Sequence, residues 1–349
     1  MKKALFFDPY LDTVGGGERY MLTLVVYLLS QGWKIDLIWD QPNIVKKIRE
    51  RFGFDLDKVN FIFNPKNLIE KLKLTKNYDL VFWLSDGSVP LLFGKNNILH
   101  FQVPFRNING KSLLNKIKLS RINNIVCNSS FTKEVIDKEF GINSRVIFPP
   151  IDVDSFSPAK KENSIIYVGR FSQLLQAKRQ DILIKVFKKM IDSGLKNWKL
   201  ILTGAVDIGG DDYYQELLKM AKNYPIQVIK NPDFQTVKKL YAQSKIFWSA
   251  SGYGIDEQKE PQKVEHFGMT IVEAMVSGCI PLVVEKGGAK EIIIDQENGF
   301  FWETEDQLIE VTKKILDDEK LLEEIQGKVI ESGRRFSVEN FTNKFNEII

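Results

Sequence analysis

Long apolar runs are the first thing that this sequence lacks. No stretch of its 349 residues approaches the roughly 20 apolar residues that an α-helix needs to cross a bilayer. At the N-terminus, Lys2 and Lys3 precede a short apolar run that Asp8 soon interrupts, too short for the core of a secretory signal. We therefore expect a cytoplasmic protein that is soluble or bound at the inner face of the cell membrane.

Cysteine is scarce, and low-complexity tracts are missing. Cys127 and Cys279 lie far apart, and no CxxC pair or histidine cluster accompanies them. This excludes a structural zinc site of the usual type and fits a reducing compartment. The absence of repeats and biased tracts excludes solenoid and disordered architectures.

Acidic residues are outnumbered in the first half of the chain. Residues 1–160 contain 23 Lys and Arg against 16 Asp and Glu, a net charge of +7, whereas the remainder carries −3. This asymmetry has two interpretations: a peripheral membrane contact through the basic N-terminal domain, or solvated surface charge. With +4 over the whole chain and no recognition motif, we expect no nucleic-acid partner.

Basic and apolar residues are interspersed in residues 111–124. Lys111, Lys116, Lys118 and Arg121 alternate there with leucines and isoleucines. Such a stretch either lies on anionic lipid or forms an ordinary helix that packs its leucines inward. We expect the inward packing.

The sequence runs twice through the same order of elements. The first pass predicts a strand at residues 3–7, a glycine-rich loop, a helix at 18–30 and a strand at 34–39. The second predicts a strand at 165–169, a helix at 181–191 and a strand at 199–202. Alternating strands and helices imply parallel sheets, so we expect an α/β protein with two Rossmann-like domains facing across a cleft.

The domain boundary is expected at a proline-rich segment, residues 148–158, which has no long periodic pattern. We place the N-terminal domain at residues 1–158 and the C-terminal domain at 159–335. Residues 336–349 are predicted to form a helix that crosses back to the N-terminal domain.

Two segments offer groups for an anionic ligand. Gly15-Gly16-Gly17 joins a strand to a helix, where backbone amides face outward, but it does not have the GxGxxG spacing of a dinucleotide site. Arg170 follows the strand at 165–169, and Lys178 precedes the next helix. The two cations could neutralise a diphosphate, or they could be solvated surface charges.

The segment EHFGMTIVEAM at residues 265–275 carries the most specific pattern. Thr270 and Glu273 match a capping box, which predicts a helix starting near Ile271. Gly268 lets the chain pass close to a ligand, and the amides of residues 267–270 can donate to hydroxyl or phosphate oxygens. Glu265 lies ahead of the helix, free to accept hydrogen bonds from sugar hydroxyls.

Taken together, these motifs resemble the family 4 glycosyltransferases of GT-B fold over nearly the whole chain. The resemblance rests on their order: Gly15-Gly16-x-Glu18-Arg19, His100 at a strand end, Gly169-Arg170-Phe171 with Lys178, the Glu265-x7-Glu273 pair, and Gly287-Gly288-x-x-Glu291. Each motif alone is weak, and the combination is specific.

The resemblance implies roles for these residues. Arg170 and Lys178 would bind the donor diphosphate, Glu265 the sugar hydroxyls and Glu273 the ribose or the diphosphate loop, and His100 would reach the donor sugar from the N-terminal domain. The catalytic set would be Glu265, His100, Arg170 and Lys178, and the donor site would add the backbone at Gly15, Gly16, Phe267, Gly268, Met269 and Thr270. The loop before Lys178, which includes Leu174 and Leu175, is longer than is common, so Arg179 is the fallback.

The implied activity is glycan biosynthesis by transfer of a hexose with retention, from a nucleotide-sugar to a glycan or lipid-linked acceptor. GDP-mannose is favoured over UDP-sugars because EHFG resembles mannosyltransferase versions. We expect no cofactor and no metal, although Asp55-x-Asp57 and Asp152-x-Asp154 formally match DxD. The alternatives are a non-catalytic module that binds sugar-nucleotides or glycans, and a GT-B epimerase.

Overall fold

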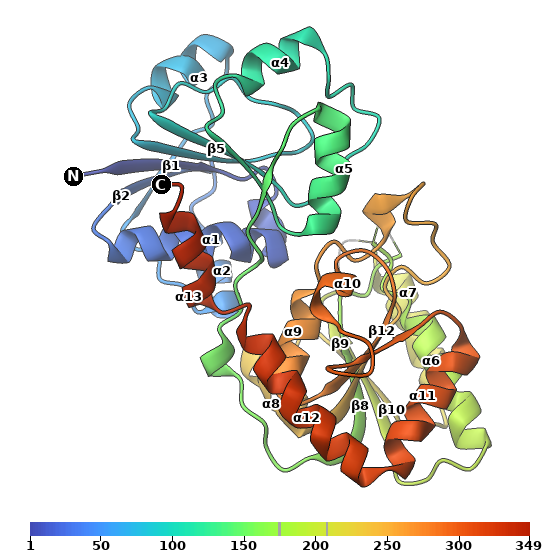
Figure 1. The fold of residues 1–349 in the computed structure, drawn as a ribbon. Coiled ribbons are helices and arrows are strands. Elements are labelled where there is room, and N and C mark those ends of the chain that lie inside the picture. The colour runs from blue at the N-terminus through green and yellow to red at the C-terminus, as the bar shows by residue number, and fades with distance from the viewer. Residues whose placement is uncertain (174–175, 207–208) are drawn as a thin grey trace. The chain divides into compact units, whose positions relative to one another are not determined.

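The computed structural model describes residues 1–173, 176–206 and 209–349. The chain divides into two compact units: unit 1 is Met1–Pro150 with Val338–Ile349, and unit 2 is Ile151–Ser337. Each is a sheet with helices packed on it (Figure 1). The division falls at Pro150, whereas the sequence places it near residue 158.

Unit 1 contains, within its described residues, a seven-stranded parallel sheet of order β3-β2-β1-β4-β5-β6-β7. Its strands are β1 (Lys3–Phe7), β2 (Lys34–Ile38), β3 (Val59–Ile62), β4 (Leu80–Leu84), β5 (Asn96–Phe101), β6 (Asn124–Cys127) and β7 (Arg145–Val146). Its helices are α1 (Gly16–Ser30), α2 (Ile44–Phe52), α3 (Leu68–Thr75), α4 (Leu113–Leu119), α5 (Ser130–Phe140) and α13 (Val338–Asn346), with a 3₁₀ turn at Leu11–Thr13. Every residue of β4 is buried, as expected for a parallel strand covered on both faces.

The C-terminal helix α13 packs on α1. The ring of Phe341 meets that of Tyr20 edge-on at 4.9 Å, and the Tyr27 hydroxyl donates to Asn346 at 2.8 Å. The last element of the chain is therefore part of the core of unit 1, although the whole of unit 2 separates it from residue 150 in the sequence.

Unit 2 contains, within its described residues, a six-stranded parallel sheet of order β10-β9-β8-β11-β12-β13. Its strands are β8 (Glu162–Val168), β9 (Lys199–Gly204), β10 (Ile226–Lys230), β11 (Ser244–Ser249), β12 (Ile280–Val284) and β13 (Phe300–Trp302). Its helices are α6 (Gln180–Asp192), α7 (Asp211–Ala221), α8 (Phe234–Gln243), α9 (Met269–Val276), α10 (Ala289–Ile292), α11 (Glu305–Asp317) and α12 (Glu319–Arg334), with 3₁₀ turns at Val153–Ser155 and Pro261–Lys263.

Both sheets place the first strand of their unit beside the fourth, which is the order of a doubly wound sheet. The strands and helices predicted from the two matching passes of sequence are confirmed as β1, α1, β2, β8, α6 and β9. The crevice at a reversal of strand order, beyond the carboxyl ends of the strands, is where such sheets bind ligands. In unit 2 this reversal lies between β8 and β11.

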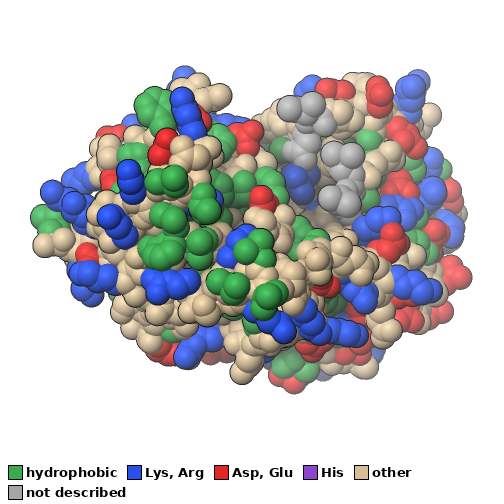
Figure 2. Space-filling view, turned by 90° about the horizontal axis from the view of Figure 1, so that it is seen from above, with side chains coloured by type: hydrophobic (Ala, Val, Ile, Leu, Met, Phe, Trp, Pro, Cys, Tyr) green, Lys and Arg blue, Asp and Glu red, His purple; other side chains and the backbone are tan. Residues whose placement is uncertain are grey.

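The inward packing expected for residues 111–124 is wrong for Leu113, Leu114 and Ile117. Helix α4 buries none of its residues, and Leu113, Leu114 and Ile117 are 75%, 62% and 56% exposed. Leu113, Leu114 and Ile117 share one side of this short helix, and that side is exposed, whereas Leu119 and Ile122 pack against the core. Hydrophobic side chains are visible among lysines and arginines on this side of the molecule (Figure 2).

Candidate functional site

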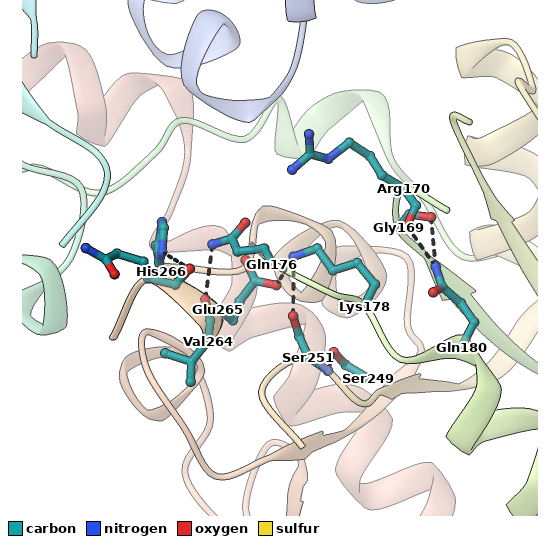
Figure 3. A network of polar contacts seen from close by, with 11 residues as sticks. Gly169, Arg170, Gln176, Lys178, Gln180, Ser249, Ser251, Val264, Glu265 and His266 are labelled. Atoms are coloured by element: carbon teal, nitrogen blue, oxygen red, sulfur yellow. Dashed lines mark hydrogen bonds and ion pairs between the residues drawn. The ribbon is translucent and has the colours of Figure 1, made fainter. Parts of the chain in front are cut away.

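The carboxyl end of β8 is held by a close approach of two backbones. A Cβ added to Gly204, at the end of β9, would lie 2.1 Å from the carbonyl oxygen of Gly169. The Gln180 side chain, from the start of α6, donates to the carbonyls of Gly169 and Arg170 at 3.2 and 3.0 Å. These contacts fix the backbone from which the exposed Arg170 side chain extends (Figure 3).

Lys178 and Glu265 form a close ion pair at the edge of the reversal between β8 and β11. Lys178 Nζ lies 2.7 Å from Glu265 Oε2, and their side chains are 11% and 16% exposed. Lys178 also donates to the hydroxyl of Ser251, just beyond β11, at 3.3 Å (Figure 3). Burial raises the pKa of Glu265, but the charge and hydrogen bond of Lys178 outweigh it, and the net pKa is below the ordinary value. Glu265 is therefore a carboxylate at neutral pH.

Arg179 does not take the place of Lys178. Its guanidinium pairs with Asp181, with Nε 3.0 Å from Oδ1. Gln176, two residues before Lys178, donates to the carbonyl of Val264 at 3.0 Å and ties this loop to the segment that carries Glu265. Leu174 and Leu175, within the loop predicted to be long, lie outside the described residues.

The capping box predicted at Thr270 and Glu273 is wrong. Helix α9 begins at Met269, and its N-cap is Gly268, whose φ of +112° belongs to the left-handed region. Because the glycine turns the chain two residues earlier than predicted, Thr270 is already inside the first turn. Glu273 is 6% exposed, and the hydroxyl of Tyr241 lies 3.2 Å from the Thr270 carbonyl and 3.5 Å from Glu273 Oε2.

Two glycines support the backbone under Glu265. Gly288 donates its N–H to the carbonyl of Glu265 at 2.8 Å. A Cβ on Gly287 would lie 2.0 Å from that same carbonyl oxygen, and one on Gly288 2.3 Å from the carbonyl oxygen of His266. A larger residue at either position would push the segment at 265–267 out of place, which gives the Gly287-Gly288 motif a physical reason.

The segment 252–263 is anchored to the same turn. The Glu257 carboxylate accepts from the Gly287 N–H at 2.6 Å and pairs with Lys290 at 2.6 Å, and Lys286 donates to the carbonyl of Ile255. This loop and the Glu265 segment therefore share one support.

The carboxylate of Glu18 holds the glycine-rich turn of unit 1 by hydrogen bonds. Gly15 is the N-cap of α1, and Glu18 Oε2 accepts from the Gly15 N–H at 2.5 Å and from the Thr13 hydroxyl at 2.7 Å. Asp8 is buried at the end of β1, and burial, with Glu18 adding to it, raises the pKa of Asp8 well above its ordinary value. Gly15 and Gly16 thus lie in unit 1, whereas the lysine, arginine and glutamates lie in unit 2.

His100 is a core residue of unit 1. Its ring is fully buried, stacks on Tyr20 with centroids 4.1 Å apart, and has Nδ1 3.1 Å from the carbonyl of Val126. Burial lowers its pKa from 6.5 to about 3, against a smaller opposite effect of that hydrogen bond. The structure therefore places His100 in the core of unit 1, and its contact with a donor sugar stays a prediction.

This burial makes unit 1 sensitive to acid. Below pH 6.5 an unfolded chain protonates His100 and the folded chain does not, so stability present above that pH is lost as the pH falls toward about 3. We expect His100 to contribute up to about 1.4 kcal/mol of this loss per pH unit. Urea unfolding of the wild type and of His100→Gln at pH 7.5 and 5 checks this; an identical loss in both proteins would contradict it.

Groups suited to a metal ion are not gathered in the described part of the chain. Among these residues no cluster of three or more His, Cys, Asp or Glu side chains has a ligating arrangement. Asp55 and Asp57, which formally match DxD, both pair with Arg49, at 3.2 and 2.7 Å.

Family models match both halves of the chain. The model described as glycosyl transferases group 1 matches residues 124–334, and that described as glycosyltransferase family 4 matches residues 14–155. The chain belongs to the group 1 glycosyl transferases. The resemblance inferred from the ordered motifs is confirmed, since the first match covers more than half of the sequence.

Individual relatives of this group 1 chain share between a quarter and a third of its residues over the matched regions. It is 28% identical over 230 residues to a GDP-Man:Man(3)GlcNAc(2)-PP-Dol alpha-1,2-mannosyltransferase of Dictyostelium discoideum, which covers 62% of this chain and 44% of that protein. The protein of that name from Kluyveromyces lactis is 26% identical over 361 residues, 81% of this chain and 61% of the other. The chain thus spans about half the length of these relatives.

A solved structure supports the fold of this group 1 member. The crystal structure of a glycosyltransferase from Rickettsia africae ESF-5 matches with a TM-score of 0.78 and 22% identity, over 99% of this chain and 97% of that one. The predicted GT-B class, with two Rossmann-like parallel-sheet domains, is confirmed.

Sequence reasoning missed two residues of the site, Ser251 and Gln180. Ser251 follows directly on the apolar run of β11, and a polar residue at a strand end beside the reversal was an available signal. Gln180 offered none, because its role depends on the direction in which the first residue of α6 points its side chain.

Proposed function

We propose that this chain is a retaining, metal-independent hexosyltransferase that uses a nucleotide-sugar donor. The observation that carries the proposal is the Lys178–Glu265 ion pair, held at 2.7 Å beside the amino end of α9. Membership of the group 1 family supports the class of reaction. The ion pair supports a site in which one group binds phosphate and the other binds sugar.

The proposed roles follow from charge. As the glycosidic bond to the diphosphate breaks, negative charge grows on the leaving group and positive charge on the sugar. Lys178, Arg170 and the amides at the start of α9 would stabilise the diphosphate, as fixed positive charges aimed at the transition state. These groups would do the work of a divalent ion, which is the basis for proposing a metal-independent enzyme.

Glu265 is proposed to accept hydrogen bonds from the sugar hydroxyls. Its carboxylate is ionised at neutral pH and pairs with Lys178, while its backbone carbonyl accepts a hydrogen bond from the Gly288 N–H. We propose a front-face displacement, in which the donor phosphate accepts the proton of the acceptor and Glu265 forms no covalent bond. Glu273, buried against Tyr241, would order the turn at Gly268 from beneath.

For the donor we propose GDP-mannose ahead of UDP-sugars. Two relatives, at 28% and 26% identity, carry GDP-Man in their names, and the EHFG sequence pointed the same way. For the acceptor we propose a glycan or a lipid-linked sugar, handled at the cytoplasmic face of a membrane. The alternatives are a binding module without turnover, and an epimerase.

Ligand-induced thermal stabilisation tests the proposal. A panel of GDP-mannose, UDP-glucose and UDP-N-acetylglucosamine, each with and without EDTA, should show the largest rise in Tm with GDP-mannose, unchanged by EDTA. At 100 times the Kd we expect a rise of about 5–10 °C. Stabilisation by none of the three would overturn the proposal, and stabilisation without transfer of labelled mannose to any acceptor would favour the binding module.

A further inference from the structure

Exposed apolar side chains occur on α3 as well as on α4. Leu68 and Ile69 at the start of α3 are 55% and 65% exposed, and Phe63, in the segment that leads to it, is 82% exposed. Monomeric proteins rarely expose several large apolar side chains next to one another unless the surface meets a partner. We call the side chains of Phe63, Leu68, Ile69, Leu113, Leu114 and Ile117 the apolar face.

The two helices that carry the apolar face lie at the same side of unit 1 (Figure 1). The backbone N–H of Phe93 donates to the hydroxyl of Thr75, the last residue of α3, at 3.1 Å, and the Arg121 guanidinium, just after α4, lies 4.8 Å from the centre of the Phe93 ring. The pKa of Lys71 in α3 is below its ordinary value, mainly because the side chain is partly buried; the charge of Asp86 raises this pKa and the charge of Lys118 in α4 lowers it. Lys71 and Lys118 are therefore close enough for their charges to interact across α3 and α4.

Positive charge surrounds the apolar face. Lys66 and Lys73 are exposed on the α3 side, and Lys111, Lys116 and Arg121 on the α4 side. No Asp or Glu occurs in the sequence between Asp86 and Glu134. Glu70 is the one acid within α3, and it is engaged by the N–H of Lys66 at 2.9 Å and by the Asn67 side chain at 2.8 Å.

We propose that the apolar face of α3 and α4, with its ring of lysines and Arg121, docks unit 1 onto the surface of an anionic lipid bilayer. The leucines and isoleucines would enter the boundary between headgroups and acyl chains, while the cations stay among the anionic headgroups. The partner is identified by this combination: exposed aliphatic side chains for acyl chains, and an excess of cations over acids for anionic headgroups. As for function, the inference rests on the proposed transfer to a lipid-linked acceptor, which the surface would bring within reach.

Vesicle cosedimentation tests the docking surface without donor or acceptor. The full chain should pellet much more with phosphatidylcholine vesicles that contain about 30% phosphatidylglycerol than with pure phosphatidylcholine vesicles. Because each basic residue at such a surface is worth about a fivefold change in binding, Lys111→Gln with Lys116→Gln should weaken binding by on the order of tenfold or more. Leu114→Gln with Ile117→Gln should weaken it to a similar extent, and high salt should reduce binding of the wild type.

Matched controls lie in unit 2. Leu218→Gln replaces a leucine that is 37% exposed, and Lys320→Gln replaces an exposed lysine; both should bind vesicles like the wild type. No binding of the wild type to anionic vesicles would overturn the inference, as would equal losses in the controls. So would a dimer in solution that the α4 substitutions dissociate while vesicle binding is unchanged. Donor stabilisation measured on the same proteins separates this result from the proposed function: failure of vesicle binding with intact stabilisation rejects the docking surface alone.

Discussion

Replacing Lys178 by methionine is expected to lower kcat for transfer by on the order of 10²–10³. The substitution keeps the length of the side chain and removes the ammonium that lies 2.7 Å from Glu265 and 3.3 Å from the Ser251 hydroxyl. That charge is proposed to stabilise the leaving diphosphate, where its effect is largest in the transition state. The measurement is steady-state transfer from the donor that gives the largest thermal shift.

Lys161→Met is the matched control for this loss. Lys161 is another partly buried lysine of unit 2, but it donates to the backbone carbonyls of Ser244 and Ser277 at 2.7 and 2.6 Å. Its replacement should cost stability and leave kcat of the folded protein within a few-fold of the wild type, since no ligand contact is proposed for it. A Lys178→Met enzyme with turnover within tenfold of the wild type would contradict the assigned role.

Glu265→Gln is expected to lower the free energy of unfolding by on the order of 3 kcal/mol, because it leaves the poorly exposed ammonium of Lys178 beside a neutral amide. The pKa of Glu265 is depressed, so the stabilisation is present above the ordinary carboxylate pKa of 4.5 and is lost as the pH falls through the folded-state value. Glu162→Gln is the control: its pair with Lys199 has the same 2.7 Å distance but is 45% and 36% exposed, and its loss should cost under about 1 kcal/mol.

The same variant bears on the mechanism. If displacement is front-face, Glu265→Gln should keep substantial turnover at pH values where it stays folded, because an amide still accepts hydrogen bonds from sugar hydroxyls. Near-complete loss of turnover, together with a glycosyl adduct on Glu265 of the wild type by intact-mass spectrometry, would contradict front-face transfer and show a covalent intermediate.

The sequence by itself determined the fold class and the segment that matters most. The alternation of apolar runs with amphipathic stretches sets the sheet type, because parallel strands must be joined by crossovers, and it predicted β8, α6 and β9 closely. The order of the motifs assigned Lys178 and Glu265 to one donor site. In the structure their charged groups lie 2.7 Å apart, although 87 residues separate them in the sequence.

Only the tertiary structure decided what each candidate side chain faces. The left-handed conformation of Gly268 makes α9 begin at Met269, so Thr270 does not cap the helix. The ring of His100 is buried against Tyr20. The local sequence at each position fits the predicted arrangement as well as the observed one. Leu113 and Leu114 of α4 were expected to be buried by periodicity, yet they are 75% and 62% exposed. Periodicity records which side chains share a face of an element, whereas burial depends on what packs against that face, and that is fixed by contacts between residues far apart in the chain.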